Sequence, residues 1–202
     1  AVRRLLVVGF GTMGFSMADV LLEPYGGQIL HLSVGATTSL TATLAAGGLL
    51  GLGLASRVLS RGADPFRMAS YGVLWGIPAF MSVIAAAPYN APELFAIGTF
   101  MVGFGAGLFG HGTLTATMNM APRHQVGLAL GAWGAAQALA AGLAIAVGGV
   151  LRDVVSSLSI QSQFGPALGY MSVYAVEILL LIWTLVVMAP LLRRSIATPA
   201  HS

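Results

Sequence analysis

The acidic residue placed deepest in an apolar stretch is Glu177, near the middle of the run 167–192. Tyr170 and Tyr174 precede it on the same helical face. A carboxyl group far from bulk water must be protonated, hydrogen-bonded or beside a water-filled space. Gln137 lies at a comparable depth in another apolar run. The two polar side chains can therefore share a functional site, or they can form an interhelical hydrogen bond of purely structural value.

A second acidic position, Asp19, belongs to a polar stripe on one face of the first apolar run, together with Thr12, Ser16 and Glu23. An ionisable residue inside a membrane indicates a cavity, a proton relay or a contact with a partner. Asp19 is a candidate for such a role. Glu23 stands directly before Pro24, so its carboxylate can equally mark a solvated helix end.

The third candidate is His111, because Gly107 and Thr115 lie one helical turn on either side of it. A neutral imidazole can ligate the magnesium ion of a chlorin, and a face without bulky side chains would let a flat macrocycle lie against the helix. We therefore predict a pigment site at these three residues, with no metal ion bound directly by the protein. Close packing of helices is the alternative explanation of the glycines. We expect the other histidines to be solvated: His31, His124 and His201.

One motif, Gly9 to Gly14, imitates the G-x-G-x-x-G fingerprint of dinucleotide-binding proteins. The fingerprint requires a βαβ unit, but the residues after it continue as a membrane span, and no acidic residue stands about 20 positions later. We expect Gly11 and Gly14 to permit close helix packing. The threonines of the second apolar run need no ligand either, because each hydroxyl can bond back to its own helix: Thr37, Thr38, Thr41 and Thr43. No catalytic motif is present, so an enzyme is not expected.

These residues are positioned by six apolar runs, each long enough to span a bilayer. With 57% hydrophobic and 7% charged residues, the composition is that of an all-α integral membrane protein. The predicted spans are 5–22, 32–56, 68–87, 94–119, 126–150 and 167–192, forming one bundle over residues 1–192 that is followed by a tail at 193–202.

The arginines predict the orientation of the bundle. All but Arg152 lie at the N-terminus, in the second and fourth loops or in the tail. By the positive-inside rule these regions, including both termini, face the cytoplasm. Cations so placed attract anionic membrane lipid, and no basic run is dense enough to indicate nucleic-acid binding.

The fifth run carries a stripe of small residues with helical spacing. Gly127, Gly131, Gly134 and Gly142 lie on one face, where they would let another helix approach closely. We therefore predict that this seam packs against a neighbouring helix.

Two stretches resemble known membrane proteins. Gly51-Leu52-Gly53-Leu54-Ala55-Ser56-Arg57, followed by Arg61-Gly62 and Arg67, resembles a degraded form of the loop signature of the major facilitator superfamily. The fifth run, from Gly127-Leu128-Ala129-Leu130-Gly131-Ala132-Trp133 through Gly148-Gly149-Val150-Leu151-Arg152-Asp153, resembles the PucC/LhaA family. That resemblance extends through residues 9–14, 19–27 and 110–114.

The resemblance implies the C-terminal six-helix half of a facilitator-like protein that assists assembly of bacterial light-harvesting antennae. It implies antenna polypeptides, bacteriochlorophyll and the N-terminal half of the same fold as partners, and a bacterial inner or intracytoplasmic photosynthetic membrane as the location. Two alternatives stay open. One is a proton-coupled secondary transporter using Asp19 and Glu177. The other is a subunit of a bacteriochlorophyll-synthesis enzyme.

Overall fold

A computed structural model describes residues 2–159 and 165–196, and within these ranges it contains α-helices, one short 3-10 turn and no strand. In chain order the helices are α1 (Val2–Gln28), α2 (Val34–Leu59), α3 (Pro65–Tyr89), α4 (Pro92–Met120), α5 (Val126–Leu158) and α6 (Gly165–Ile196). The 3-10 turn, Arg123–Gln125, precedes α5. Each predicted span corresponds to a different one of these six helices, and all six helices are long and apolar enough to cross a membrane.

The helices extend beyond the predicted spans, except that α2 begins at Val34 rather than at residue 32. α1 continues through Pro24 to Gln28, and α5 continues past Val150 to Leu158. α6 ends at Ile196 rather than at residue 192, and residues 197–202 of the predicted tail lie outside the described residues. Hydropathy underestimates helix length because it detects only the apolar part of a helix, whereas the backbone hydrogen bonds continue into the polar interface.

Local sequence signals fix where several helices begin and end. The Ser33 hydroxyl accepts a hydrogen bond from the amide of Ala36 at 3.2 Å, and the Asp64 carboxylate accepts one from the amide of Arg67 at 2.8 Å. Both are N-caps that satisfy amides left free at the first turn. Asn90 ends α3 in the left-handed region, with a φ of 45°. The connecting segments are short, so successive helices run in opposite directions.

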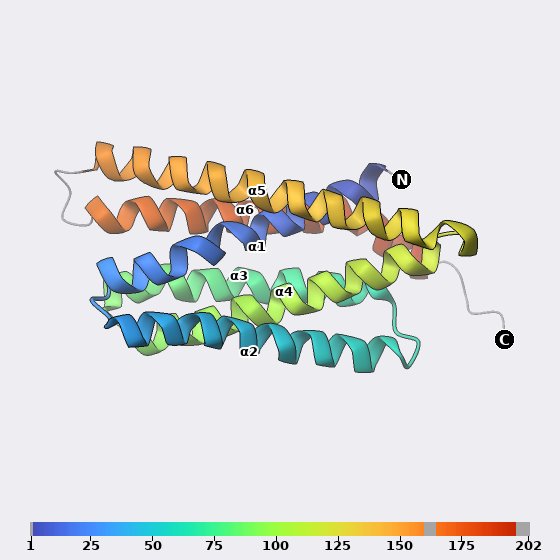
Figure 1. Ribbon diagram of the computed structural model, residues 1–202, viewed down its shortest axis with the longest axis horizontal. Helices are drawn as coiled ribbons and strands as arrows, with labels where there is room; N and C mark the ends of the chain where they lie inside the picture. Colours follow the sequence, from blue (N-terminus) through green and yellow to red (C-terminus); the bar gives the residue numbers. More distant parts are fainter. Residues whose placement is uncertain (1, 160–164, 197–202) are drawn as a thin grey trace.

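The helices form two groups that lie side by side in Figure 1, with α1, α5 and α6 in the upper group and α2, α3 and α4 in the lower one. Contacts of α3 with α6 and of α1 with α4 join the groups. Buried aromatic side chains fill the space between them, including Phe15, Phe80 and Tyr25. α1 begins and α6 ends at the same end of the bundle (Figure 1).

Glycines on two faces of α4 bring it close to both of its neighbours. A β-carbon on Gly105 would lie 2.7 Å from the carbonyl oxygen of Gly72 in α3, and one on Gly112 would lie 2.7 Å from the amide nitrogen of Ala69. On another face, a β-carbon on Gly103 would lie 3.0 Å from the amide nitrogen of Gly48 in α2. These backbones can therefore approach only because the residues are glycine.

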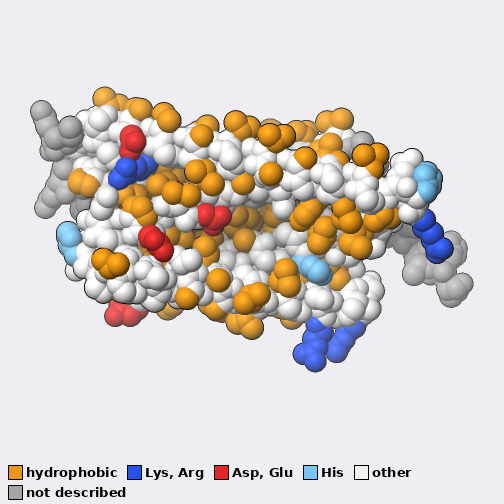
Figure 2. Space-filling view, in the orientation of Figure 1, with side chains coloured by type: hydrophobic (Ala, Val, Ile, Leu, Met, Phe, Trp, Pro, Cys, Tyr) orange, Lys and Arg blue, Asp and Glu red, His pale blue; other side chains and the backbone are white. Residues whose placement is uncertain are grey.

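The outer surface is typical of a membrane protein. Apolar side chains are spread along the whole face in Figure 2, and basic side chains gather mainly toward one end of the molecule. Exposed apolar residues occur on several helices, among them Leu49, Leu139 and Leu179, which are 71%, 69% and 64% exposed. Such side chains are suited to the apolar interior of a membrane.

Candidate functional site

Glu177 lies at the contact between α6 and α1 and is completely buried. Its Oε1 atom accepts a hydrogen bond from the backbone amide of Ala18 at 2.8 Å. An amide inside a helix ordinarily donates to the carbonyl four residues earlier, which is that of Gly14. The carboxyl group thus competes with the hydrogen-bond ladder of α1 in the middle of the membrane.

The second carboxyl oxygen of Glu177, Oε2, is buried without a hydrogen-bond partner, and so is the hydroxyl oxygen of Tyr174 one turn earlier on α6. Tyr174 packs edge-on to Tyr25 of α1, with ring centres 5.6 Å apart. The Tyr25 hydroxyl donates to the carbonyl of Val83 at 3.2 Å. The acidic group therefore stands at the end of an aromatic cluster that connects α1, α3 and α6.

The same cluster reaches a polar network at the end of the bundle opposite to the N-terminus. Arg152 donates to the hydroxyl of Tyr170 at 2.8 Å, to Gln28 at 3.0 Å and to Asp153 at 2.6 Å. The Tyr170 hydroxyl also donates to Gln28, at 2.8 Å. Sequence reasoning missed this network, because its members are far apart in the chain. The available signal was that Arg152 breaks the distribution of the other arginines.

Asp19 follows Ala18 on α1, and its side chain is exposed on the bundle surface while that of Glu177 is enclosed. Glu23, one turn later, accepts a hydrogen bond from the hydroxyl of Thr41 in α2. The expectation that Thr41 bonds back to its own helix was therefore wrong. It was right for the remaining three threonines of this group, Thr37, Thr38 and Thr43. Within the polar stripe of α1, Glu23 thus joins the helix to α2, whereas the side chain of Asp19 is exposed on the surface of the bundle.

The surroundings of His111 differ from those predicted. His111 and Thr115 are half-buried on α4, but the space beside Gly107 is occupied by the backbone of α2. A β-carbon on Gly107 would lie 2.9 Å from the amide nitrogen of Leu52. The expectation that Gly107 clears room for a planar ligand is therefore corrected, because the glycine serves helix packing. Ligation of a pigment by His111 stays a prediction.

Gln137 and the glycine seam of α5 are also placed differently. Glu177 bonds to Ala18 of α1, and Gln137 is not among its hydrogen-bond partners in the described residues. Of the four seam glycines, none has another described atom within 4 Å of a built β-carbon: Gly127, Gly131, Gly134 and Gly142. The described bundle contacts α5 through buried Ala140, Ala144 and Gly148 instead. The seam is thus a small-residue face without a helix on it in the described structure.

The glycines of the dinucleotide-like motif are packing residues. A β-carbon on Gly11 would overlap the ring of Phe109, and one on Gly14 would lie 2.8 Å from the side chain of Leu181. This confirms that the two glycines permit close packing, although the groups that pack against them are side chains rather than a second helix backbone. His31 and His124 are exposed, as predicted, and His201 lies outside the described residues.

Chemically, the buried site around Glu177 can hold one proton, or accept one more donor at Oε2. Within residues 2–159 and 165–196, no cluster of three or more histidine, aspartate or glutamate side chains could hold a metal ion. The arrangement therefore offers an acidic group beside a cluster of aromatic side chains, with its backbone partner on a neighbouring helix.

Comparison with known sequences identifies the family. The sequence model described as "PUCC protein" matches residues 1–196. The chain belongs to this family. The match covers all six helices, so the resemblance seen in separate motifs extends over the whole bundle.

Three curated relatives carry the name Protein PucC. The protein of Cereibacter sphaeroides is 54% identical over 197 residues, which are 98% of this chain and 43% of the relative. That of Rhodovulum sulfidophilum is 61% identical over 154 residues, 76% of this chain and 34% of the relative. That of Rhodobacter capsulatus is 52% identical over 192 residues, 94% of this chain and 41% of the relative. The chain thus spans less than half the length of the PucC proteins that it matches.

Proposed function

We propose that this PucC-family protein is an assembly factor for bacterial light-harvesting antennae, which binds antenna polypeptides and delivers bacteriochlorophyll without catalysing a reaction. The observation that carries the proposal is the open small-residue face of α5. Gly131 and Gly142 are exposed there, and nothing in the described bundle covers them. Small residues allow two helix backbones to approach within a membrane, so this face suits a transmembrane helix.

The chemistry of the α5 face favours a helix over lipid alone as its occupant. Membrane helices associate through van der Waals packing and shape, and a glycine stripe offers a groove that flexible lipid tails fill less specifically. The N-terminal half of the same fold is a second helical occupant that we propose for part of this surface, because α2 and α5 have only 17% of their apolar windows buried, compared with 61% for α1. Photosynthetic membranes are the proposed location, with both termini in the cytoplasm.

The test is affinity isolation of the complete protein from its native photosynthetic membrane in mild detergent. Mass spectrometry would identify co-purifying polypeptides, and the absorption spectrum would report bacteriochlorophyll. We expect both with the natural sequence. Gly131→Leu should leave the bundle folded, because its β-carbon meets open space, but should lower recovery of antenna polypeptides. Gly9→Leu on α1 is the matched control and should not lower this recovery, since a β-carbon at Gly9 also meets open space.

Two further variants test where bacteriochlorophyll binds. Loss of bacteriochlorophyll with His111→Leu, and its retention with Glu177→Gln, would support axial ligation by the imidazole. The opposite pattern would place the pigment near Glu177. A preparation with neither antenna polypeptides nor pigment would contradict the assembly function.

The burial of the Glu177 carboxyl group favours a second candidate function, that of a proton-coupled transporter. A buried carboxyl group with a free oxygen can take up and release a proton while its contact with α1 changes. Proton-driven uptake of a small solute into vesicles, abolished by Glu177→Gln, would establish transport. An enzyme subunit of pigment synthesis has no comparable support among the described residues.

A further inference from the structure

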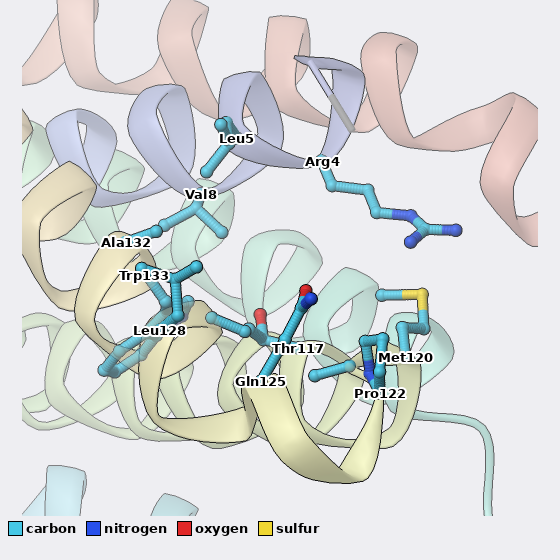
Figure 3. Close-up of a pocket in the computed structure, with 12 residues that line it drawn as sticks. Arg4, Leu5, Val8, Thr117, Met120, Pro122, Gln125, Leu128, Ala132 and Trp133 are labelled. Atoms are coloured by element: carbon cyan, nitrogen blue, oxygen red, sulfur yellow. The ribbon is translucent and has the colours of Figure 1, made fainter.

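A cavity of about 320 Å³ lies between the beginning of α1, the end of α4 and the beginning of α5. Figure 3 shows the side chains that form it. Its walls are mostly apolar, and they include Leu5, Val8, Met120, Leu128 and Trp133. Its volume lies at the lower end of the range of about 300–1,000 Å³ that is usual for sites of small molecules. The cavity is separate from Glu177, His111 and the glycine seam.

Polar groups occur at particular points of this cavity. Arg4 extends from α1 toward the end formed by Met120 and Pro122, and the amide of Gln125 points into the cavity from the opposite wall (Figure 3). None of the lining residues is acidic. Arg4 is exposed, so its guanidinium group lies at the mouth rather than in the interior. The site thus combines an apolar interior with one cationic group at its entrance.

The cavity is open at the surface of the described bundle. Leu128 in its wall is 75% exposed, and Ala132, one turn later on α5, is exposed too. A flexible hydrocarbon chain can therefore enter between α1 and α5. At the same end of the bundle a headgroup would meet Arg4, whose five N–H donors suit a phosphate.

We propose that this cavity binds one anionic phospholipid, with an acyl chain against Val8 and Trp133 and its phosphate at Arg4. A zwitterionic lipid would fill the apolar part equally well but would gain less from the arginine, since its headgroup has no net charge. Selectivity for the anionic headgroup is the property that separates a built site from ordinary lipid contact. The inference does not depend on the proposed assembly function.

Trp133 provides an internal reporter for the test. The 202 residues contain three tryptophans, and replacing Trp75 and Trp183 by phenylalanine leaves Trp133 as the only one among them. This variant would be reconstituted into phosphatidylcholine vesicles that contain increasing fractions of phosphatidylglycerol or phosphatidylcholine brominated on its acyl chains. Bromine quenches tryptophan fluorescence on contact, so the half-maximal fraction of each lipid measures its occupancy beside Trp133.

We expect half-maximal quenching at an about five-fold lower fraction of brominated phosphatidylglycerol than of brominated phosphatidylcholine. That ratio corresponds to about 1 kcal/mol for one basic side chain near an anionic headgroup. Arg4→Gln should bring the ratio to about one, whereas Arg3→Gln should preserve it, because Arg3 does not line the cavity. A variant that retains only Trp183, which is 53% exposed on α6, should show no preference for either lipid.

A substitution that fills the cavity provides a second test of the proposal. Ala132→Phe should reduce quenching of Trp133 by both lipids, since a ring at this position would occupy the space of the acyl chain. Equal quenching by the two lipids in the natural sequence would overturn the proposal, as would a preference that Arg4→Gln leaves intact. Undiminished quenching in Ala132→Phe would show that the lipid lies outside the cavity and would overturn it too.

Discussion

The hydroxyls of buried Thr99 and Thr184 donate to carbonyls of their own helices, but other buried polar groups in this protein join two helices. Glu177 is the clearest example, because its carboxyl group bonds to the amide of Ala18 on a different helix and is shielded from solvent. A polar atom that loses its partner in such a place costs about 1–3 kcal/mol. The effect of a substitution should therefore depend on whether it retains an acceptor for the Ala18 amide.

Two substitutions of Glu177 separate the acceptor from the acid. Glu177→Gln keeps a carbonyl oxygen in reach of Ala18, so we expect a change of less than about 1 kcal/mol in the free energy of unfolding. Glu177→Leu removes the acceptor, and we expect a loss of about 1–3 kcal/mol. Thermal unfolding in detergent, followed by tryptophan fluorescence, measures both. Equal losses in the two variants would mean that the bundle requires the acid itself.

The Arg152 network allows a second test at the scale of residues. Arg152→Met would remove the donors to Gln28 and Tyr170 but keep most of the side-chain bulk, and we expect a loss of about 1–2 kcal/mol. Asp153→Asn is the control and should cost less than about 1 kcal/mol, because Asp153 is 68% exposed and water screens that ion pair. The same unfolding measurement applies. A larger loss for Asp153→Asn than for Arg152→Met would place the stabilising contact in the ion pair.

At the scale of helices, identical residue types have different roles on α4 and α5. Gly103 and Gly107 lie against the backbone of α2, whereas Gly127 and Gly131 face open space. Both groups have the spacing of a small-residue seam, and spacing alone does not indicate which seam is occupied. The difference arises because α5 turns its alanine-rich face, with Ala140 and Ala144, toward the bundle.

Paired alanine substitutions test this difference. Gly107→Ala would place a methyl group against the rigid backbone of Gly48 and Leu52, and we expect a destabilisation of about 1–3 kcal/mol. Gly131→Ala should be neutral or stabilising by up to about 1 kcal/mol, since alanine favours helix and the site is open. Thermal unfolding of the purified bundle measures both. A large destabilisation by Gly131→Ala would show that a helix covers the seam after all.

For the whole molecule, the arrangement of charge along the bundle axis predicts its orientation in the membrane. The even number of described helices places the beginning of α1 and the end of α6 at one end (Figure 1). The loop from α2 to α3 and the segment from α4 to α5, which carry Arg61 and Arg123, lie at this end as well. The positive-inside rule assigns the end to the cytoplasm.

Labelling of single cysteines can test the orientation directly, because these 202 residues contain no cysteine. Ser60→Cys, in the loop after α2, should react with an impermeant thiol reagent only from the cytoplasmic side. Tyr89→Cys should react only from the opposite side. Tyr89 is 77% exposed and avoids the left-handed backbone of Asn90, so substitution there should not disturb the turn. The reverse pattern of labelling would overturn the orientation.

The sequence by itself determined the membrane class, the number of helices and the membership of a family. Each of these follows from properties of continuous segments: apolar length, alternation of charged loops, and motifs such as Gly110-His111-Gly112. The depth of Glu177 in the membrane could also be predicted, because its position within an apolar run fixes its distance from both membrane surfaces. Such properties need no knowledge of how the helices are arranged.

Only the tertiary structure decided the partners of these residues. The rotation of each helix about its axis selected Ala18 rather than Gln137 as the neighbour of Glu177, and filled the notch at Gly107 with α2 while leaving Gly131 open. It also joined Gln28, Arg152 and Tyr170 across three helices. In a membrane every face of a helix is apolar enough to meet lipid, so the apolar pattern does not specify the rotation, and packing of side chains and backbones determines it instead.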